Sequence, residues 1–359
     1  MKLFYITKVM IPSGAAQSVQ IASMCEAFSN QSIEFELFSP LSEDNKNINK
    51  SFKWNKIKLY TKFRYLEMIL RMVFIVLKQK PSHIFTREIA IAYIFSIFNL
   101  KVTYEAHKEP RTSTANFMIK ALRKKENFLL VTISQALKDY YIKEYNYEDK
   151  KIFDYHDAVF IEKYDELRKY SQNDLREELN LPKEKQIVMH TGSLYDGRGA
   201  EHFETILKNF KDLFFVQVGG TKEDILKYKE KYIEYRNIKF IGHQENATLI
   251  KYQMCADLLF YPMTKATSTY WCCSPMKMFE FMATGIPVLS SNVGSVSEVL
   301  NETNSIPFNP EDEQSIVDGI RFYLEKKEET ELRAKKALQD VREKYIWEKR
   351  VEKILEFIE

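Results

Sequence analysis

The sequence is poor in cysteine and has no long uninterrupted apolar run. Its 359 residues include four cysteines, none of them in a CxxC pair. Adjacent cysteines, as at Cys272 and Cys273, make a poor disulfide or metal pair, which favours a reducing compartment. No segment reaches the roughly 18 apolar residues that indicate a membrane-spanning helix. The first residues resemble a strand and lack the apolar core of a signal peptide, so we expect a cytoplasmic protein.

A strong excess of charge of one sign is also missing. The 53 Lys and Arg residues nearly balance the 50 Asp and Glu residues, which leaves a net charge of +3. Such a balance argues against nucleic acid as a partner. Metal motifs are absent too, because there is no HExxH and no further ligand completes the polar cluster Asp154-Tyr-His-Asp157. We therefore expect no dedicated metal ion and no cofactor.

The length suggests about two domains, and strand-like runs alternate with helix-like stretches, as in parallel α/β proteins. A charged stretch from about 160 to 185 indicates the junction, after which the strand-loop-helix pattern starts again. The last residues carry an apolar stripe at helical spacing that begins at Trp347. Strands are expected near 3–6, 35–38, 83–86, 101–104, 128–133, 186–191, 213–218, 238–241, 256–261 and 285–290.

The segment from Ser274 to Ser290 is the most informative part of the chain. Ser274 is a natural N-cap, Pro275 suits the first helical position, and Gly285 suits the residue that ends a helix. Met276, Phe279 and Ala283 share one helical face and are expected to pack inward.

Lys277 and Glu280 lie one turn apart on another face of this expected helix. A cation in the first turn, where free backbone N–H groups favour an anion, suits a diphosphate. A carboxylate one turn later suits a ribose diol. The alternative is an exposed Lys–Glu pair on an ordinary helix.

Three loops could contribute to the same chemistry. The stretch Gly192 to Gly199 resembles a phosphate loop but lacks its Lys and Ser/Thr, which leaves Arg198 to bind phosphate oxygens. The alternative is a turn with a solvated arginine. In the first half, the small residues from Pro12 to Gln17 would let a ligand approach the backbone. His107 follows a predicted strand, at the edge where ligands of α/β proteins bind, although a loop histidine is more often a surface residue.

Two basic segments, 62–80 and 120–125, mix lysine and arginine with apolar residues. Such segments are typical of peripheral contact with an anionic membrane. The alternative is a helix packed on the sheet with a charged edge. Because residues 66–77 are apolar nearly all round, we expect that helix to be mostly buried.

Taken in order, these motifs resemble a retaining GT-B glycosyltransferase of family four (glycosyl transferases group 1). The resemblance rests on the first loop, Glu105-Ala-His107, Val131-Thr-Ile-Ser134, the paired Arg198-Gly199 and the segment from Ser274. It implies an α/β GT-B fold of two Rossmann-like domains facing across a cleft. Residues 1–165 would bind the acceptor and 183–342 the nucleotide sugar, and a last helix at 343–359 would cross back to the first domain.

The resemblance also implies roles for individual residues. His107, Arg198, Lys277 and Glu280 are the expected catalytic residues. Two departures are that Cys272 replaces a common first glutamate and that Ser193 replaces a usual basic residue. The expected donor-binding residues are Gly14, Ala15, Gly192, Ser193, Gly219, Ser274, Pro275, Met276 and Met278.

The implied activity is that of a hexosyltransferase-like enzyme that uses a nucleotide-diphosphate sugar of UDP or GDP type. The acceptor would be a glycan or a lipid-linked glycan of bacterial surface polysaccharide synthesis, reached from the cytoplasm or the inner face of the cell membrane. Two alternatives stay open: a nucleotide-sugar epimerase of GT-B fold, and a non-catalytic GT-B subunit that binds a glycan or a partner. A P-loop NTPase is disfavoured by Arg198-Gly199.

Overall fold

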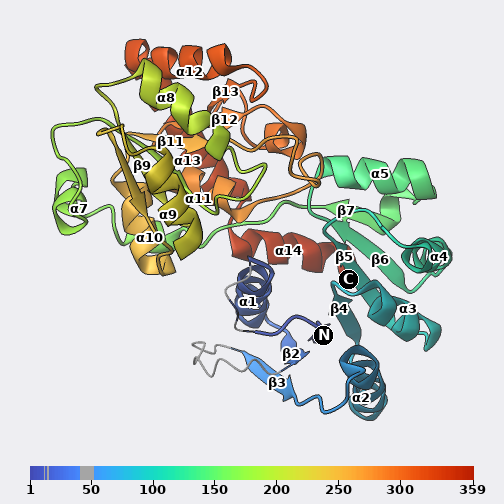
Figure 1. Cartoon of the computed structure of the whole chain (residues 1–359). Helices are drawn as coiled ribbons and strands as arrows, with labels where there is room; N and C mark the ends of the chain where they lie inside the picture. Colours follow the sequence, from blue (N-terminus) through green and yellow to red (C-terminus); the bar gives the residue numbers. More distant parts are fainter. Residues whose placement is uncertain (12, 14–15, 41–51) are drawn as a thin grey trace. The chain divides into compact units, whose positions relative to one another are not determined.

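The computed structural model describes residues 1–11, 13, 16–40 and 52–359 (Figure 1). Gly14 and Ala15, two of the expected donor-binding residues, lie outside the described residues. The chain divides into two compact units. The first contains Met1–Asp157 and Trp347–Glu359, and the second contains Ala158–Ile346.

The first unit is built on a seven-stranded, wholly parallel sheet in the order β3-β2-β1-β4-β5-β6-β7. Its strands are β1 (Lys2–Ile6), β2 (Glu34–Pro40), β3 (Lys53–Ile57), β4 (His83–Thr86), β5 (Lys101–Ala106), β6 (Phe128–Thr132) and β7 (Ile152–Asp154). Its helices are α1 (Ala16–Ser29), α2 (Arg64–Gln79), α3 (Ile89–Ile97), α4 (Ser113–Leu122), α5 (Gln135–Tyr145), the 3-10 turn η1 (Asp149–Lys151) and α14 (Trp347–Ile358).

The second unit is built on a six-stranded parallel sheet in the order β10-β9-β8-β11-β12-β13. Its strands are β8 (Ile187–Thr191), β9 (Phe214–Val218), β10 (Ile238–Ile241), β11 (Leu258–Tyr261), β12 (Val288–Ser291) and β13 (Ile306–Phe308). Its helices are α6 (Glu162–Asp165), α7 (Gln172–Glu178), η2 (Ala200–His202), α8 (Phe203–Asn209), α9 (Lys222–Lys231), α10 (Asn246–Met254), α11 (Met276–Thr284), η3 (Gly294–Glu298), α12 (Glu313–Glu325) and α13 (Lys327–Lys344).

The boundary of the first unit lies at Asp157, eight residues before the expected 165. The charged stretch that suggested a linker instead forms α6 and α7 and belongs to the second unit. Tyr164 of α6 is buried and donates a hydrogen bond to the Gln253 side chain at 2.9 Å. On α7, the buried Arg176 donates to the carbonyl of Cys255 at 2.9 Å and pairs with Asp257 at 2.6 Å. These inward-facing contacts fix the stretch to the second core.

The closing helix α14 returns to the first unit and packs against α1 (Figure 1). The expected apolar stripe is confirmed. Burial of such large side chains supplies about 1.5–3 kcal/mol each, which is enough to hold a short helix on the sheet. The buried members of the stripe are Trp347, Val351, Ile354, Leu355 and Ile358.

Candidate functional site

The first group of expected site residues meets at the carboxyl end of the second sheet, where β8 and β9 end. Gly192 and Gly219 follow these strands with φ of +149° and +111°, backbone conformations that favour glycine. A Cβ atom on Gly219 would lie 2.5 Å from the Gly192 carbonyl oxygen, so the two loops approach too closely for any side chain. This packing leaves backbone groups at the edge where α/β proteins bind ligands.

Helix α11 begins one residue later than expected. Pro275 occupies the N-cap in an extended conformation and makes no side-chain capping hydrogen bond, so the expected N-cap at Ser274 is wrong. Ser274 is buried. Gly285 does end the helix, with φ +75°, as predicted. The first turn of α11 is a place where the helix dipole would stabilise an anion.

The expected inward face of α11 is confirmed in part. Phe279 and Ala283 are fully buried, but Met276 is only half-buried. Met278 is fully buried, and its N–H donates to the Pro275 carbonyl at 3.0 Å. The side chain of Met278 therefore packs in the core of the second unit.

Lys277 projects toward the end of β8. Its amino group donates to the carbonyl of Thr191, beside Gly192. Burial lowers the pKa of Lys277 to about 8; nearby Glu280 opposes this shift and Arg198 adds to it. A lysine held in this way carries a charge at neutral pH that one backbone carbonyl satisfies only in part, so it suits an anionic ligand.

Glu280 lies on the same helix but contacts a different partner. One of its carboxylate oxygens accepts a hydrogen bond from the Gln253 amide at 3.0 Å, and that amide also lies 3.3 Å from the Thr191 hydroxyl. The carbonyl oxygen of Gln253 in turn accepts from Tyr164 at 2.9 Å. Among the ion pairs of the described residues none joins Lys277 to Glu280, which argues against a simple surface pair.

A buried histidine that was not singled out from the sequence supports this loop. Nδ1 of His190 lies 2.5 Å from the Gln217 carbonyl oxygen, and the Gln217 amide donates to the Gly192 carbonyl at 2.9 Å. Since the Gln217 amide is oriented by Gly192, its oxygen accepts and Nδ1 of His190 carries the proton. Burial, with Lys277 next in order, lowers the pKa of His190 to about 3, so the ring is neutral.

Arg198 lies in the loop after β8, within electrostatic range of Lys277 and His190. Its guanidinium carbon lies 4.9 Å from the centre of the Tyr195 ring, and its Nε donates to the Tyr195 hydroxyl at 2.7 Å. Ser193 is exposed beside it, whereas Cys272, at the position of the missing glutamate, is fully buried. The second unit thus gathers Lys277, Arg198 and the glycine loops around one strand end.

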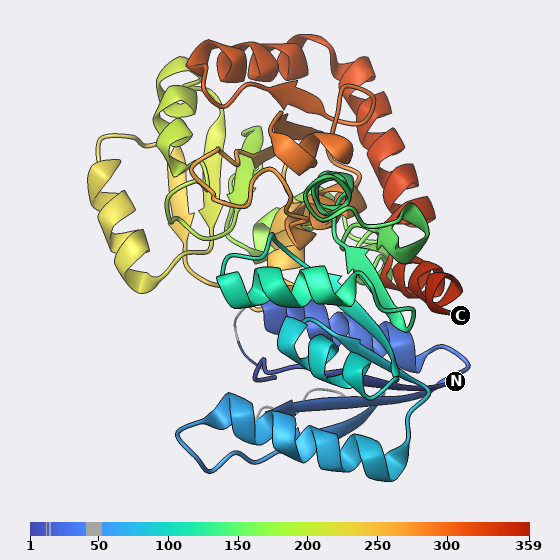
Figure 2. The same ribbon diagram turned by 90° about the vertical axis from the view of Figure 1, so that its right-hand side faces the viewer.

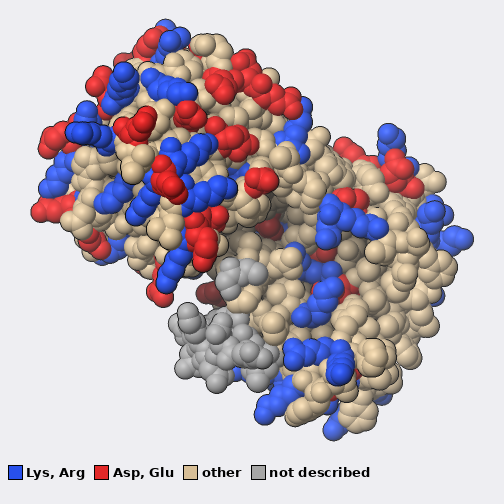
Figure 3. All heavy atoms as spheres, viewed as in Figure 1, with Lys and Arg blue, Asp and Glu red and all other residues tan. Residues whose placement is uncertain are grey.

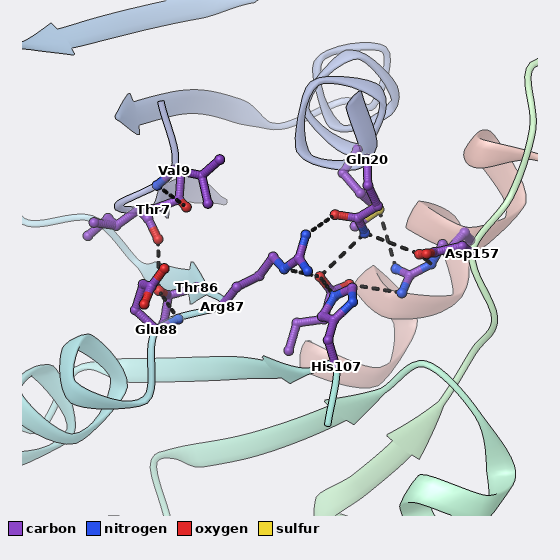
Figure 4. A network of polar contacts seen from close by, with 12 residues as sticks. Thr7, Val9, Gln20, Thr86, Arg87, Glu88, His107 and Asp157 are labelled. Carbon is purple, nitrogen blue, oxygen red and sulfur yellow. Dashed lines mark hydrogen bonds and ion pairs between the residues drawn. The ribbon is translucent and has the colours of Figure 1, made fainter. Parts of the chain in front are cut away.

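The remaining expected catalytic residue, His107, belongs to a polar network in the first unit (Figure 4). Its Nε2 lies 2.8 Å from Glu105, the fully buried carboxylate near the end of β5. Glu105 also pairs with Arg350 at 2.8 Å and lies 3.8 Å from Arg87. The Gln20 side chain bridges the network, because it accepts from Arg87 at 2.6 Å and donates to Asp157 at 3.2 Å.

The charges in this network offset one another. Burial opposes ionisation of Glu105, but Arg350, His107 and Arg87 together hold its pKa well below the usual range. Burial and the Arg87 charge lower the pKa of His107, although Glu105 acts in the opposite direction. The lowered pKa favours the neutral form of His107, and the ionised carboxylate of Glu105 orients its ring.

Arg350 was not recognised as a site residue from the sequence. It is fully buried on α14, and its Nε donates to the His156 carbonyl at 2.9 Å. The available signal was its position, three residues after Trp347 and within the apolar stripe. Asp157, considered above as part of a metal cluster, lies 3.8 Å from Arg350. Among the residues that the structure describes, no group of three or more His, Cys, Asp or Glu side chains could hold a metal ion.

The first unit also contains a cavity of about 460 Å³ between α2 and the ends of β2 and β3. Three cations, Lys8, Lys58 and Arg64, stand among largely apolar walls. Lys8 pairs with Glu88 at 2.8 Å and lies 5.2 Å from the centre of the Tyr65 ring. The other lining residues are Met10, Pro40, Ile57, Leu59, Tyr60, Tyr65 and Met68.

The two basic segments that could contact a membrane, 62–80 and 120–125, differ in how far their side chains are exposed in the structure. No helix among the described residues has the length and apolarity needed to span a bilayer. The expectation that the 62–80 helix is mostly buried is wrong, since one face of α2 is exposed. In the 120–125 segment, Arg123 turns inward and donates to the Tyr145 carbonyl at 2.7 Å.

Comparison with known proteins agrees with this architecture. Residues 171–340, most of the second unit, match the family model described as glycosyl transferases group 1. The Anabaena protein HepE, in a structure with UDP, superposes with a TM-score of 0.80 at 15% identity over 99% of both chains. The two parallel-sheet, Rossmann-like units are thus the GT-B fold predicted from the sequence.

Two curated relatives are 24% identical over 62% of this chain. An uncharacterized glycosyltransferase of Methanocaldococcus jannaschii is matched over 57% of its length. A chitobiosyldiphosphodolichol beta-mannosyltransferase of Candida albicans is matched over 50%. The chain therefore spans about half the length of these relatives.

Proposed function

We propose that this protein transfers a sugar from a nucleotide-diphosphate sugar to a glycan or lipid-linked acceptor. The observation that carries the proposal is the placement of Lys277, in the first turn of α11, against the glycine loop after β8. A lysine, a nearby arginine and the amino end of a helix suit a diphosphate better than any other common ligand. The match of residues 171–340 to a glycosyltransferase family model supports the same activity.

In this proposal the diphosphate leaves as the bond between its oxygen and the anomeric carbon breaks. The electron pair moves onto the phosphate oxygen, where Lys277, Arg198 and the first-turn amides stabilise the growing negative charge. Glu280 accepts hydrogen bonds from the ribose hydroxyls, and Gln253 holds its carboxylate in place. His107, oriented by Glu105, contacts the donor sugar and shields the positive charge at its anomeric carbon.

We propose retention of the anomeric configuration, with the acceptor oxygen attacking from the face that the phosphate leaves. The acceptor proton then passes to the departing phosphate, so no protein nucleophile is required. The resemblance to retaining enzymes supports this stereochemistry. It would be tested by the anomeric coupling constant of the newly formed glycosidic linkage, measured by NMR on the purified product.

The donor is proposed to be of UDP type, with GDP as the other candidate, because HepE was crystallised with UDP and UDP-glucose. The cavity beside α2 is proposed to bind the acceptor. Its three cations and apolar walls suit a phosphorylated lipid-linked glycan. The lipid diphosphate named in the Candida albicans relative supports this class, as does a role in surface polysaccharide assembly at the inner face of the membrane.

The activity would be tested by the release of UDP or GDP from candidate donors in the presence of a lipid-linked acceptor extract. Lys277→Ala and Glu280→Ala should each reduce turnover at least about a hundred-fold, since each removes a group that contacts the donor. Lys265→Ala is the matched control, because Lys265 forms an exposed pair with Glu311 at 2.8 Å. Undiminished turnover in both site variants would overturn the assignment, and turnover with donor alone would favour an epimerase.

A further inference from the structure

Helix α2 presents an exposed row of large apolar side chains. Leu66, Leu70, Phe74 and Leu77 recur at helical spacing, and each exposes more than half of its surface. Phe63, just before the helix, is 77% exposed and continues the row. The opposite face packs on the sheet through Met68, Met72 and Val76, which are buried. The helix is thus apolar on two faces, and the protein itself covers only one of them.

The exposed row differs from ordinary surface apolar residues. Single exposed apolar side chains need no explanation, but a contiguous row along about 17 Å of helix indicates an interaction surface. Figure 2 shows α2 along the outer side of the first sheet, with no described element drawn beyond it. The row therefore needs a partner that lies flat against one helix.

Cations surround this row. Arg64, Arg71 and Lys78 recur every seven residues and so form a line along one edge of the apolar face. Lys58 and Lys62 precede the helix, and Lys80 follows it. Figure 3 shows lysine and arginine side chains gathered over this part of the first unit.

The single carboxylate between residues 58 and 80, Glu67, is occupied within the protein. It accepts hydrogen bonds from the N–H groups of Tyr60 and Thr61, at 2.9 and 2.8 Å, and pairs with Arg71 at 2.8 Å. These bonds hold the loop that precedes α2 against the start of the helix. Glu67 therefore offsets the charge of Arg71, and the other cations leave the surface offered to a partner apolar and cationic.

We propose that the outer face of α2 docks on an anionic lipid bilayer, with the apolar row in the acyl-headgroup boundary and the cations at the lipid phosphates. A second copy of this chain would satisfy the apolar row, but a symmetric contact would bring the same cations together. An anionic bilayer matches both the apolar row, through its acyl chains, and the cations, through its lipid phosphates. The proposal goes beyond glycosyl transfer, because it assigns a membrane-binding face whatever the reaction is.

The test is flotation of the whole protein with vesicles of phosphatidylcholine alone or with 30% phosphatidylglycerol, a composition of about one anionic lipid in three. We expect binding to the anionic vesicles only, and its loss at high salt. Leu70→Ser with Phe74→Ser should reduce partitioning at least about ten-fold. Lys62→Ser with Lys78→Ser should reduce it about five-fold for each charge removed.

The control for apolar loss is Leu226→Ser with Ile233→Ser, because these residues are 70% and 78% exposed on the second unit. This control should float like the unaltered protein, and nucleotide binding should be the same in all four proteins. Equal binding to both vesicle types, or no binding to either, would overturn the proposal. So would a concentration-dependent dimer in sedimentation that the α2 apolar variant abolishes.

Discussion

At the scale of single residues, the sequence indicated the groups with ligand chemistry but not those that orient them. Lys277, Glu280 and Arg198 stood beside recognisable helix and loop signals, and the structure gathers them around the end of β8. Gln253 and His190, which support this site, lie in segments without a motif. They become partners only through the pairing of β8 with β9 and the packing of α10, which no local pattern encodes.

Arg350 offers a test of the network around His107. Replacing it with Met would leave Glu105 buried without its closest cation, so we expect a loss of about 3–5 kcal/mol in the free energy of unfolding. Glu105→Gln combined with Arg350→Met should recover part of this loss, because residue 105 then carries no charge that needs the Arg350 guanidinium. Urea denaturation measures the free energy of unfolding of the single and the double variant. The control is Lys353→Met, which removes an exposed ion pair on the same helix and should leave the free energy of unfolding nearly unchanged. A loss of stability in Lys353→Met equal to that in Arg350→Met would contradict the account.

Lys277 should give nucleotide binding a characteristic pH dependence. Its pKa is lowered to about 8, and a diphosphate binds its charged form. The affinity should therefore fall about ten-fold between pH 7 and pH 9, a range in which the nucleotide phosphates are already ionised. Calorimetric titration at each pH measures this. Lys277→Arg keeps its charge over the whole range, so this variant should lose the pH dependence, and an unchanged profile would exclude Lys277 as its source.

At the scale of elements, most strands could be predicted because their apolar runs are continuous. The three missed strands are short or polar: β3 carries two lysines and an asparagine, β7 has three residues, and β13 contains a proline. The end of α11 was predicted by Gly285, but its start was predicted one residue too early, because Pro275 and not Ser274 occupies the N-cap position.

Gly285 allows the end of α11 to be tested. Its φ is +75°, and a Cβ atom would lie 3.3 Å from Leu338, so Gly285→Ala should cost about 1 kcal/mol of stability. Gly242→Ala is the matched control, because nothing lies within 4 Å of its Cβ position. Thermal unfolding gives the melting temperatures of the two variants, which are compared with that of the unaltered protein. Equal melting temperatures would show that the left-handed turn contributes no measurable stability.

At the scale of the whole molecule, the order of strands and loops along the chain was enough to predict two parallel α/β units with a returning C-terminal helix. The junction was predicted within residues 160–185, but the first unit ends at Asp157, because a polar stretch that packs through a few buried side chains resembles a linker in the sequence. The exposure of the outer face of α2 could not be predicted either, because the sequence of an apolar row does not show whether the protein or a partner covers it.

The central claim is that the second unit holds a nucleoside diphosphate between α11 and the loop after β8. Calorimetric titration of the whole protein with UDP and with GDP tests it most directly. We predict that one of them binds, that Lys277→Met weakens this binding at least about ten-fold, and that Lys265→Met leaves it unchanged. Absence of binding by both nucleotides, or equal affinity in Lys277→Met, would contradict the account.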